Sequence, residues 1–438
     1  MLKKNKMLVF LASIIVALLF SGCQGGTADE ASGEAENNED AVQLRVLHSF
    51  TGAQPQAPVI EPAFKEFDNN HKDIDLKIET AAGNTILEQL KTEMAADDAP
   101  DVFTHWGMRR TENYIKNGVI PDISGLIEED NLKEQYREGA FGPVTYKGGI
   151  YGLPFQGYSY YFMINKKLFE EHNVKVPTTY EELKDAVVKF KEAGYIPFAA
   201  NNHSARYMLL TWFAQKKNYE DLVAHSTAEK PFGDALLEAA QKADELAELG
   251  AFPEGYMNMA TAQSLELFHA EQAPMFYQHS WTIGSIDPEL LKNYQVIPFP
   301  LGDSESVPTT LAGTGHFIYM SKDAYEDPEK REAAWKLMNK IAGKEVGRQF
   351  VEKIANQTPL KVEYDVDKVN PVLNEVLKNI DRSENVLPSY EEELFASAVE
   401  GEYWPLTDSL LLQKIEPKEY VEQMNAIIEE NPNVQFEK

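Results

Sequence analysis

The sequence predicts an α/β fold built as two lobes. The chain has 438 residues, more than one hydrophobic core usually supports, so two lobes are expected. Strand and helix patterns alternate near its beginning, as in a doubly wound sheet. A third observation is the stretch at residues 148–169, GGIYGLPFQGYSYYFMINKKLF, whose aromatic run surrounds a Gln-Gly pair. We expect this stretch to cross between the lobes and to line a cleft.

The N-terminal elements follow from periodicity. Alternating apolar residues predict strands at residues 44–50 (LRVLHSF) and 75–80 (DLKIET). An amphipathic helix is expected after each of them, and residues 102–105 read as a third strand. Ligands bind such sheets beyond the carboxyl ends of the strands. This rule selects the loops at residues 49–52 and 105–109.

Later elements are predicted from the same periods and from turn residues. A hairpin with a glycine turn is expected at residues 144–152. Further strands are predicted at residues 195–200, 273–277, 296–299 and 310–320. Helices are predicted around residues 110–117, 126–136, 179–193, 232–249, 261–269, 328–341 and 344–354. The C-terminal tail reads as mostly helical.

Residues 1–22 are predicted to be a signal peptide. Lysines precede an apolar run at residues 7–20, which is too short for a stable membrane span. Small residues then lead to Cys23, a pattern that resembles a bacterial lipobox, so we expect Cys23 to be lipidated. An ordinary secretion signal with a chance cysteine is the alternative. Residues 23–41 are expected to be the lipidated cysteine and a disordered acidic tether.

Composition and motifs exclude several function classes. The net charge of −29 argues against nucleic acid as a partner, because nucleic-acid binding needs a basic surface. Cys23 is the only cysteine, so neither an intrachain disulfide nor a thiolate metal site is expected. The sequence contains no His-Glu-x-x-His, Gly-x-Ser-x-Gly or Walker pattern. We therefore expect no catalytic residues, no metal and no cofactor, with a surface glycosidase as the remaining enzymatic alternative.

Short motifs recur in a characteristic order along the chain. They are APDV at 99–102, YGLP at 151–154, NK at 165–166, PTTYEEL at 177–183, APM at 273–275, SW at 280–281, FP at 299–300, AAW at 333–335 and TP at 358–359. The set resembles the extracellular solute-binding protein family 1 of bacterial ABC transporters, the maltose-binding-protein-like sugar-binding lipoproteins. Ile164 and Tyr180 depart from it conservatively, and Gln278-His279 replaces a glycine that the family usually has before the tryptophan.

The resemblance implies a type II periplasmic-binding-protein-like fold, with two hinge-connected lobes that each contain a sheet flanked by helices. Lobe 1 would comprise residues 42–156 plus 305–358, and lobe 2 residues 157–304 plus 359–438. It implies a monomeric, non-enzymatic receptor that is lipid-anchored on the extracytoplasmic face of a Gram-positive cell membrane. Such a receptor would capture a mono- or oligosaccharide and deliver it to an ABC permease. A glycerophosphodiester, a peptide or a polyamine remains an alternative ligand.

Sugar binding requires aromatic rings for the C–H faces and polar side chains for the hydroxyls. The predicted ligand-binding residues are Thr51, Trp106 and Arg109 in lobe 1, Gln156 and Tyr158 in the crossing, and Asn202, His203, His279, Trp281 and Trp404 in lobe 2. Trp281 is the first choice, because it follows an apolar strand and the resemblance places a stacking tryptophan there. Packing of the tryptophans in a core, and of Gln156 and Tyr158 at a hinge, are the alternatives.

Overall fold

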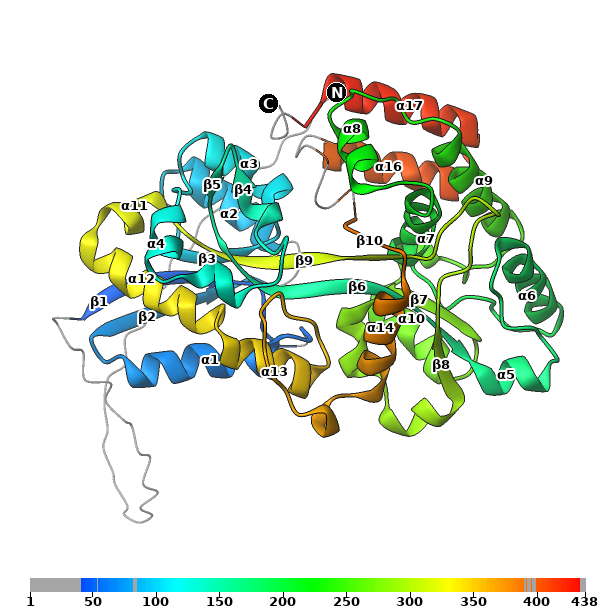
Figure 1. Ribbon diagram of the computed structural model, residues 1–438, viewed down its shortest axis with the longest axis horizontal. Coiled ribbons are helices and arrows are strands. Elements are labelled where there is room, and N and C mark those ends of the chain that lie inside the picture. Colours follow the sequence, from blue (N-terminus) through cyan, green and yellow to red (C-terminus); the bar gives the residue numbers. More distant parts are fainter. Residues whose placement is uncertain are drawn as a thin grey trace, which may run out of the picture. The chain divides into compact units, whose positions relative to one another are not determined.

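The structure is a computed structural model that describes residues 41–433, except residues 53, 82–84, 390, 392–394 and 396–398. The predicted signal peptide, Cys23 and nearly all of the predicted tether lie outside the described residues. The fold is α/β, with a sheet flanked by helices, as predicted (Figure 1).

The strands are β1 (Val42–His48), β2 (Ile74–Thr80), β3 (Val102–His105), β4 (Thr145–Tyr146), β5 (Gly149–Ile150), β6 (Leu153–Asn165), β7 (Met275–His279), β8 (Tyr294–Ile297), β9 (Thr309–Met320) and β10 (Asn385–Leu387). The helices are α1 (Ala57–Asn70), α2 (Thr85–Ala95), α3 (Met108–Lys116), α4 (Ser124–Glu129), α5 (Lys166–Glu171), α6 (Tyr180–Glu192), α7 (Asn202–Ala214), α8 (Tyr219–Ser226), α9 (Asp234–Glu248), α10 (Thr261–His269), α11 (Lys322–Glu326), α12 (Pro328–Ile341), α13 (Lys344–Ile354), α14 (Pro371–Arg382), α16 (Glu400–Leu411) and α17 (Pro417–Glu430).

Local sequence signals explain where several of these elements begin. The side chain of Thr179 accepts a hydrogen bond from the backbone N–H of Glu182 at the start of α6, and Asn201 does the same at the start of α7. The predicted β-α-β-α-β opening is confirmed. The strand predicted at residues 195–200 is wrong: there Phe198 makes a single bridge to Met275, and its N–H bonds to a loop carbonyl after α9.

Two long strands carry the sheet through the molecule. The strand order is β2-β1-β3-β9-β6-β7, with β8 also paired to β6 and β10 to β9. β1 is parallel to β2 and β3, whereas β9 is antiparallel to β3 and β6. The first half of β6 pairs with β9, and the second half lies between β7 and β8. β6 and β9 therefore run side by side in the middle of the molecule, along the first half of β6 (Figure 1).

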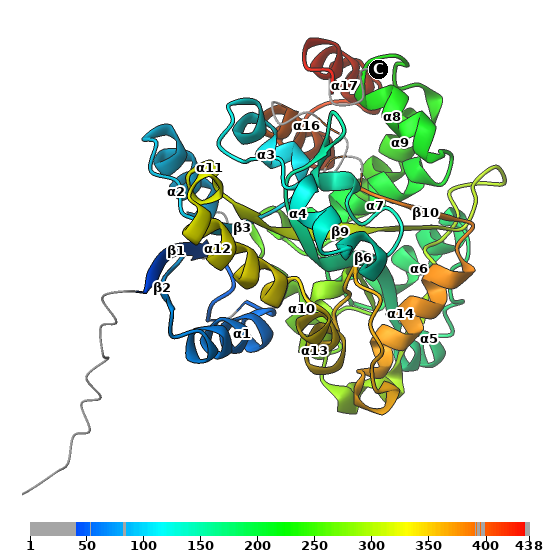
Figure 2. The same ribbon diagram turned by 60° about the vertical axis from the view of Figure 1, so that its left-hand side comes forward.

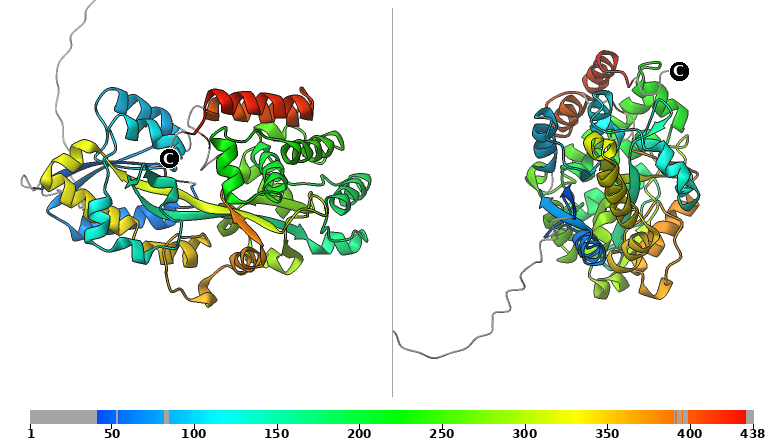
Figure 3. Two further views of the ribbon diagram at one scale, coloured as in Figure 1. Left: turned by 45° about the horizontal axis from the view of Figure 1, so that its top comes forward. Right: turned by 90° about the vertical axis from the view of Figure 1, so that its left-hand side faces the viewer.

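The buried apolar side chains form three clusters that β6 connects. The first, which we call the N-terminal core, contains Phe103 and Leu337, and helices α1, α12 and α13 pack around it (Figure 2). The second, the C-terminal core, contains Leu209 of α7, and α9, α16 and α17 pack together over it (Figure 3). β6 contributes Phe155 to the first core and Phe162 to the second, and other β6 side chains to a third cluster.

Candidate functional site

Two loops bring polar and aromatic side chains to the same edge of the sheet. β1 and β3 are parallel neighbours, so their carboxyl ends meet there. The loop after β1 contributes Phe50 and Gln56, and the residue after β3 is Trp106. The Tyr319 hydroxyl of β9 donates a hydrogen bond of 3.0 Å to the Trp106 carbonyl, which fixes this loop.

A bulge in β9 shapes the middle of the site. Gln156 pairs with His316 but Gly157 pairs with Thr314, so Gly315 is an extra residue. A Cβ atom at Gly315 would lie 3.2 Å from Cζ2 of Trp281 and 3.2 Å from a ring carbon of Tyr158. A side chain at this position would therefore crowd both rings, and glycine lets the indole approach this backbone closely.

A row of rings extends from the bulge into the second half of the sheet. The rings of His316 and Trp106 lie 5.1 Å apart between centroids, and those of His316 and Trp281 lie 5.2 Å apart. Trp281 follows β7, and its ring is 4.6 Å from that of His279. His279 is in turn 5.3 Å from His203, at the start of α7. Rings from the first half of the sheet, those of Trp106 and His316, therefore lie close to the rings of Trp281 and His279 from the second half.

These elements enclose a cavity of about 580 Å³, which we call the Trp281 cavity. Its described lining residues are Ser49, Phe50, Gln54, Pro55, Gln56, Trp106, Thr261, Ala262, Leu265, Glu266, His269, His279, Trp281, Thr282, Ser285 and His316. They include no lysine or arginine, and Glu266 is the only acidic residue among them. The volume is typical of a small-molecule site.

Several buried polar atoms on or beside this cavity have no hydrogen-bond partner among the described residues. They are Oε1 of Gln56, Nε2 of Gln156, Nδ1 of His279, Nε1 of Trp281 and Nδ1 of His316. Leaving one such group unbonded costs about 1–3 kcal/mol. The set mixes donors, acceptors and imidazoles of either role. Hydroxyl groups donate and accept, so they match the set in kind once the side chains turn these buried atoms towards a ligand.

A second cluster, which we call the Arg110 cluster, joins α3, α7 and α16. The guanidinium carbon of Arg110 lies over the ring of Trp106, 4.9 Å from its centroid, and over the ring of Trp404, 5.6 Å from its centroid. Arg206 lies 5.4 Å over the same Trp404 ring. Its guanidinium donates two hydrogen bonds to Asp408, of 2.7 and 2.6 Å. Both arginines therefore share one indole.

A buried carboxylate fixes the far edge of this cluster. Glu391 is 2% exposed, and its Oε1 accepts a hydrogen bond of 3.3 Å from the Trp404 indole N–H. The same oxygen accepts a 2.7 Å bond from the hydroxyl of Tyr207, whose ring stacks on Tyr160. Trp404 is thereby held in a fixed orientation.

Burial keeps the histidines of the site neutral near pH 7. It lowers the pKa of His279 to about 4 and that of His316 to about 3. The pKa of His203 is also lowered, first by burial and then by the nearby positive charges, including those of Arg206 and Arg110. A neutral imidazole offers one donor and one acceptor, which suits the hydroxyls of an uncharged ligand.

These shifts predict a loss of stability in mild acid. A histidine whose pKa is lower in the folded state than its unfolded value of 6.5 stabilises the folded state above pH 6.5. For His279 this stabilisation is lost as the pH falls towards 4. For His279 the full loss is about 3 kcal/mol. We expect His279→Gln to lose less stability than the wild type between pH 7 and pH 4.5, measured by thermal unfolding. His172→Gln, at an exposed position, is the control, and equal losses in all three proteins would contradict the assignment.

The described part of the chain contains no group of histidine, cysteine or acidic side chains that could hold a metal ion. Nor does any helix among the described residues have the length and apolar character needed to cross a membrane.

Residues 62–371 match the sequence profile of a family described as bacterial extracellular solute-binding protein. This match covers more than half of the chain. The chain belongs to the bacterial extracellular solute-binding proteins. The cavity and the converging rings are thus found in a family whose members bind solutes.

Two curated relatives of this solute-binding protein match over part of their lengths. An uncharacterized ABC transporter extracellular-binding protein of Pyrococcus horikoshii is 28% identical over 200 residues, which is 45% of each chain. The multiple sugar-binding protein of Streptococcus mutans is 22% identical over 285 residues, which is 62% of this chain and 64% of that protein. The matches span less than two thirds of either relative.

Solved structures resemble this solute-binding protein over most of its length. One, from a study of xylan utilization by the thermophilic bacterium Caldanaerobius polysaccharolyticus, has a TM-score of 0.76 at 24% identity and covers 88% of this chain and 99% of its own. Another, a chitin oligosaccharide binding protein, has a TM-score of 0.79 at 20% identity and covers 90% and 99%. These likenesses place the fold among the type II periplasmic binding proteins, as predicted.

The structure brings five of the predicted site residues together. Trp106, His279 and Trp281 line the Trp281 cavity. Gln156 lies beside it and accepts a 3.3 Å hydrogen bond from the amide of Gln56. His203 is adjacent through its ring contact with His279.

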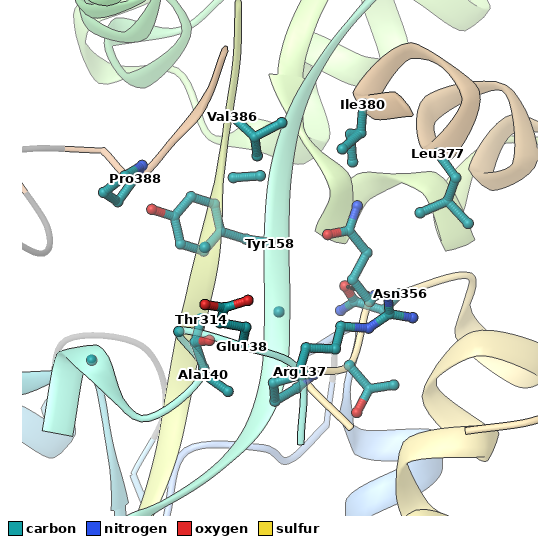
Figure 4. Close-up of a pocket in the computed structure, with 18 of the residues that line it drawn as sticks. Arg137, Glu138, Ala140, Tyr158, Thr314, Asn356, Leu377, Ile380, Val386 and Pro388 are labelled. Atoms are coloured by element: carbon teal, nitrogen blue, oxygen red, sulfur yellow. Dashed lines mark hydrogen bonds between the residues drawn. The ribbon is translucent and has the colours of Figure 1, made fainter. Parts of the chain in front are cut away.

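Tyr158 lies at a different cavity. Its side chain is 2% exposed, and its hydroxyl accepts a 3.0 Å hydrogen bond from the backbone N–H of Ser389. It lines a cavity of about 630 Å³ that shares no described lining residue with the Trp281 cavity. Figure 4 shows this second cavity, with Val386, Ile380 and Leu377 on one side and Arg137 and Glu138 on the other. Gly157 lines this second cavity, whereas the preceding β6 residue, Gln156, lies beside the Trp281 cavity.

The remaining predicted residues divide into three cases. Trp404 belongs to the Arg110 cluster. Asn202 and Thr51 do not line the Trp281 cavity: the Asn202 side chain accepts a hydrogen bond from the next backbone N–H, and Thr51 is held in its loop by backbone hydrogen bonds. The side chain of Arg109 lies outside the described residues.

Sequence reasoning missed several residues that the structure places at the site. They are Gln56, Arg110, Glu391, Asp408 and His316. His316 could have been selected from the sequence, because it directly follows the Gly-Thr-Gly segment that interrupts a predicted strand. Arg110 adjoins the predicted Arg109, but the helical register that distinguishes the two was not visible in the sequence.

Proposed function

We propose that this solute-binding protein captures a mono- or oligosaccharide in the Trp281 cavity and delivers it to an ABC permease. The observation that carries the proposal is the scarcity of charge on the cavity wall, where the described lining residues include no lysine or arginine and Glu266 is the only acidic residue. Its indole and imidazole rings suit the C–H faces of a sugar, and its unbonded polar atoms suit the hydroxyls. The sugar-binding names of the Streptococcus mutans relative and of the chitin oligosaccharide binding protein agree with it.

The charged groups on the wall of the Trp281 cavity are too few for the alternative ligands or for a glycosidase. A glycerophosphodiester would need a cation, and the described lining residues include no lysine or arginine. A polyamine would need several carboxylates, and a glycosidase needs two of them placed across the bond. Glu266, whose side chain is 77% exposed, is the only carboxylate among the described lining residues.

We further propose that the site closes between the two predicted lobes. Residues 42–156 plus 305–358 form lobe 1 in this proposal, and residues 157–304 plus 359–438 form lobe 2. The contacts Trp281 to His316 and Trp404 to Arg110 then cross from one lobe to the other. A ligand that touches both lobes binds the closed arrangement more tightly and shifts the population towards it.

In this proposal the protein acts as a monomer, anchored outside the cell membrane by a lipid on Cys23. The anchor is tested by Cys23→Ala in the producing cell. We expect the variant to leave the membrane fraction for the medium, whereas the wild type stays with the membrane. Retention of the variant on the membrane would contradict lipid anchoring.

The ligand class is tested by titrating the purified full chain. Intrinsic tryptophan fluorescence should change saturably with at least one member of a panel of mono-, di- and trisaccharides, because three tryptophans lie at the site. A hydrophobic dipeptide, glycerophosphocholine and spermidine serve as comparison ligands. Saturable binding of one of these, with no response to any sugar, would overturn the proposed ligand class.

A further inference from the structure

The cavity that Tyr158 lines, which we call the Tyr158 cavity, has no role in the proposed function. Its volume of about 630 Å³ lies in the range of small-molecule sites. Helix α14 contributes Leu377 and Ile380 to its wall, β10 contributes Val386, and residues 137–140 lie on the other side (Figure 4). Segments that are far apart in the sequence therefore enclose a space of the same order as the Trp281 cavity.

Much of this wall is apolar, and part of it is open to solvent. Val386 is 48% exposed and Tyr219 is 45% exposed, and these are two of the six large hydrophobic side chains that are exposed in the described part of the chain. The charged residues of the wall, Arg137, Glu138 and Asp381, are exposed, so their charges remain in water. Exposed apolar side chains gathered around a cavity indicate a binding site.

The Tyr158 cavity has few buried polar atoms in need of a partner. Nδ2 of Asn356 is the only buried side-chain polar atom of its described lining residues that has no hydrogen-bond partner among the described residues, whereas five such atoms lie on or beside the Trp281 cavity. A sugar would give up hydrogen bonds to water here without regaining them from the protein. An apolar molecule has no such bonds to lose and gains from burial. The wall therefore favours a compact apolar molecule.

Tyr158 connects this cavity to Trp281 by packing. A Cβ atom at Gly315 would lie 3.2 Å from a ring carbon of Tyr158 and 3.2 Å from one of Trp281. The ring that lines one cavity and the ring that lines the other thus pack against the same glycine. A molecule that presses on Tyr158 therefore changes the packing of Trp281.

A chain of hydrogen bonds makes a second connection. The side-chain amide of Gln357, which lines the Tyr158 cavity, donates a 2.6 Å hydrogen bond to Oγ of Ser159. The backbone N–H of Ser159 donates a 3.1 Å hydrogen bond to Oγ of Ser280, the residue before Trp281. Both serines are fully buried, so this chain joins the wall of one cavity to the loop that carries the ring of the other.

We infer that the Tyr158 cavity is an effector site, which binds a compact apolar molecule and thereby strengthens sugar binding in the Trp281 cavity. The coupling rests on the proposed function, whereas the binding of the apolar molecule does not. The sign follows from the structure, because the described arrangement contains both cavities together with the contact of Trp281 to His316. A molecule that fits the Tyr158 cavity stabilises this arrangement, in which the rings for the sugar are already in place.

The probe for the effector site is N-phenyl-1-naphthylamine, an uncharged aromatic molecule whose fluorescence rises in apolar surroundings. We expect the full chain to bind it saturably. Leu377→Glu and Val386→Glu each place a carboxylate in the apolar wall, and each should weaken binding at least about tenfold, because the probe would then remove water from a charge. Val188→Glu is the matched control, since Val188 is an exposed valine on α6 that is not among the described lining residues of either cavity.

The coupling is measured with the sugar of the panel that binds best. At a saturating concentration of this sugar, the Kd of the probe should fall at least about fivefold. The probe should tighten sugar binding by the same factor in calorimetric titration, because coupling between two binding sites is reciprocal. Thermal unfolding shows whether each variant is folded, and Val386→Glu, at an exposed position, keeps the test decisive if Leu377→Glu does not fold.

Each outcome decides the inference. Failure of the wild type to bind the probe, or binding by the folded glutamate variants as tight as that of the wild type, overturns the effector site and leaves the proposed function standing. Release of the probe by the sugar places the probe in the Trp281 cavity and overturns the site as well. A Kd of the probe that the sugar leaves unchanged overturns the coupling. If no sugar binds, the proposed function and the coupling both fail, and the probe titrations of the variants still decide whether the Tyr158 cavity is a binding site.

Discussion

Replacing Trp281 by alanine is expected to weaken sugar binding at least about 30-fold, which corresponds to the 2 kcal/mol or more of a binding hot spot. The indole forms part of the cavity wall between His279 and His316, with ring centroids 4.6 and 5.2 Å away. The substitution removes one of the two indole faces among the described lining residues, together with the buried indole N–H, which has no partner among the described residues. Calorimetric titration with the best sugar of the panel measures the effect.

Two further variants separate stacking from general destabilisation. Trp281→Phe keeps an aromatic face and should recover most of the lost affinity. Trp335→Ala removes another half-buried indole, on α12, which donates to Asp130 at 2.7 Å outside the cavity, and should bind sugar as the wild type does. An affinity of Trp281→Ala within about twofold of the wild type would show that the ligand does not rest on this ring.

The sequence allowed half of the site to be predicted because that half depends on local rules. Alternating apolar residues marked β1 and β3, and parallel strands end at one edge of the sheet. That rule selected the loop of Trp106. Trp281 was selected because an apolar strand ends shortly before it and because the family resemblance places a stacking tryptophan there.

The other half depends on contacts between distant segments. His316 lies where the register between β6 and β9 shifts twice, at Phe155 and at Gly315, and an inserted residue reverses which side chains face a given side of the sheet. Thr51 was selected by the same loop rule that found Trp106, yet Gln56, five positions later, is the residue that reaches Gln156. Arg206 and Asp408 are 202 positions apart, and no periodicity connects them.

The second large effect is expected at this distant ion pair. Asp408→Asn removes the charge that faces Arg206, a residue only 8% exposed. Breaking a buried pair leaves an uncompensated charge and typically costs 3–5 kcal/mol. The Asp408 side chain is 27% exposed, so solvent screens part of the interaction and we expect about 2–3 kcal/mol. Thermal or urea-induced unfolding measures the loss, with Asp185→Asn, an exposed acid on α6, as the control.

The Arg206–Asp408 ion pair also supports the ring of Trp404. We therefore expect Asp408→Asn to change the affinity for sugar as well as the free energy of unfolding. Once Asp408 no longer holds it, the guanidinium of Arg206, which lies 5.4 Å over the indole, is free to turn towards solvent, and the affinity for sugar should fall. Replacing both partners by apolar residues, Arg206→Met with Asp408→Leu, removes the unpaired charge and should restore most of the stability. It should not restore the affinity, because the cation that supports Trp404 is absent. A double variant that recovers both would show that the pair serves folding alone.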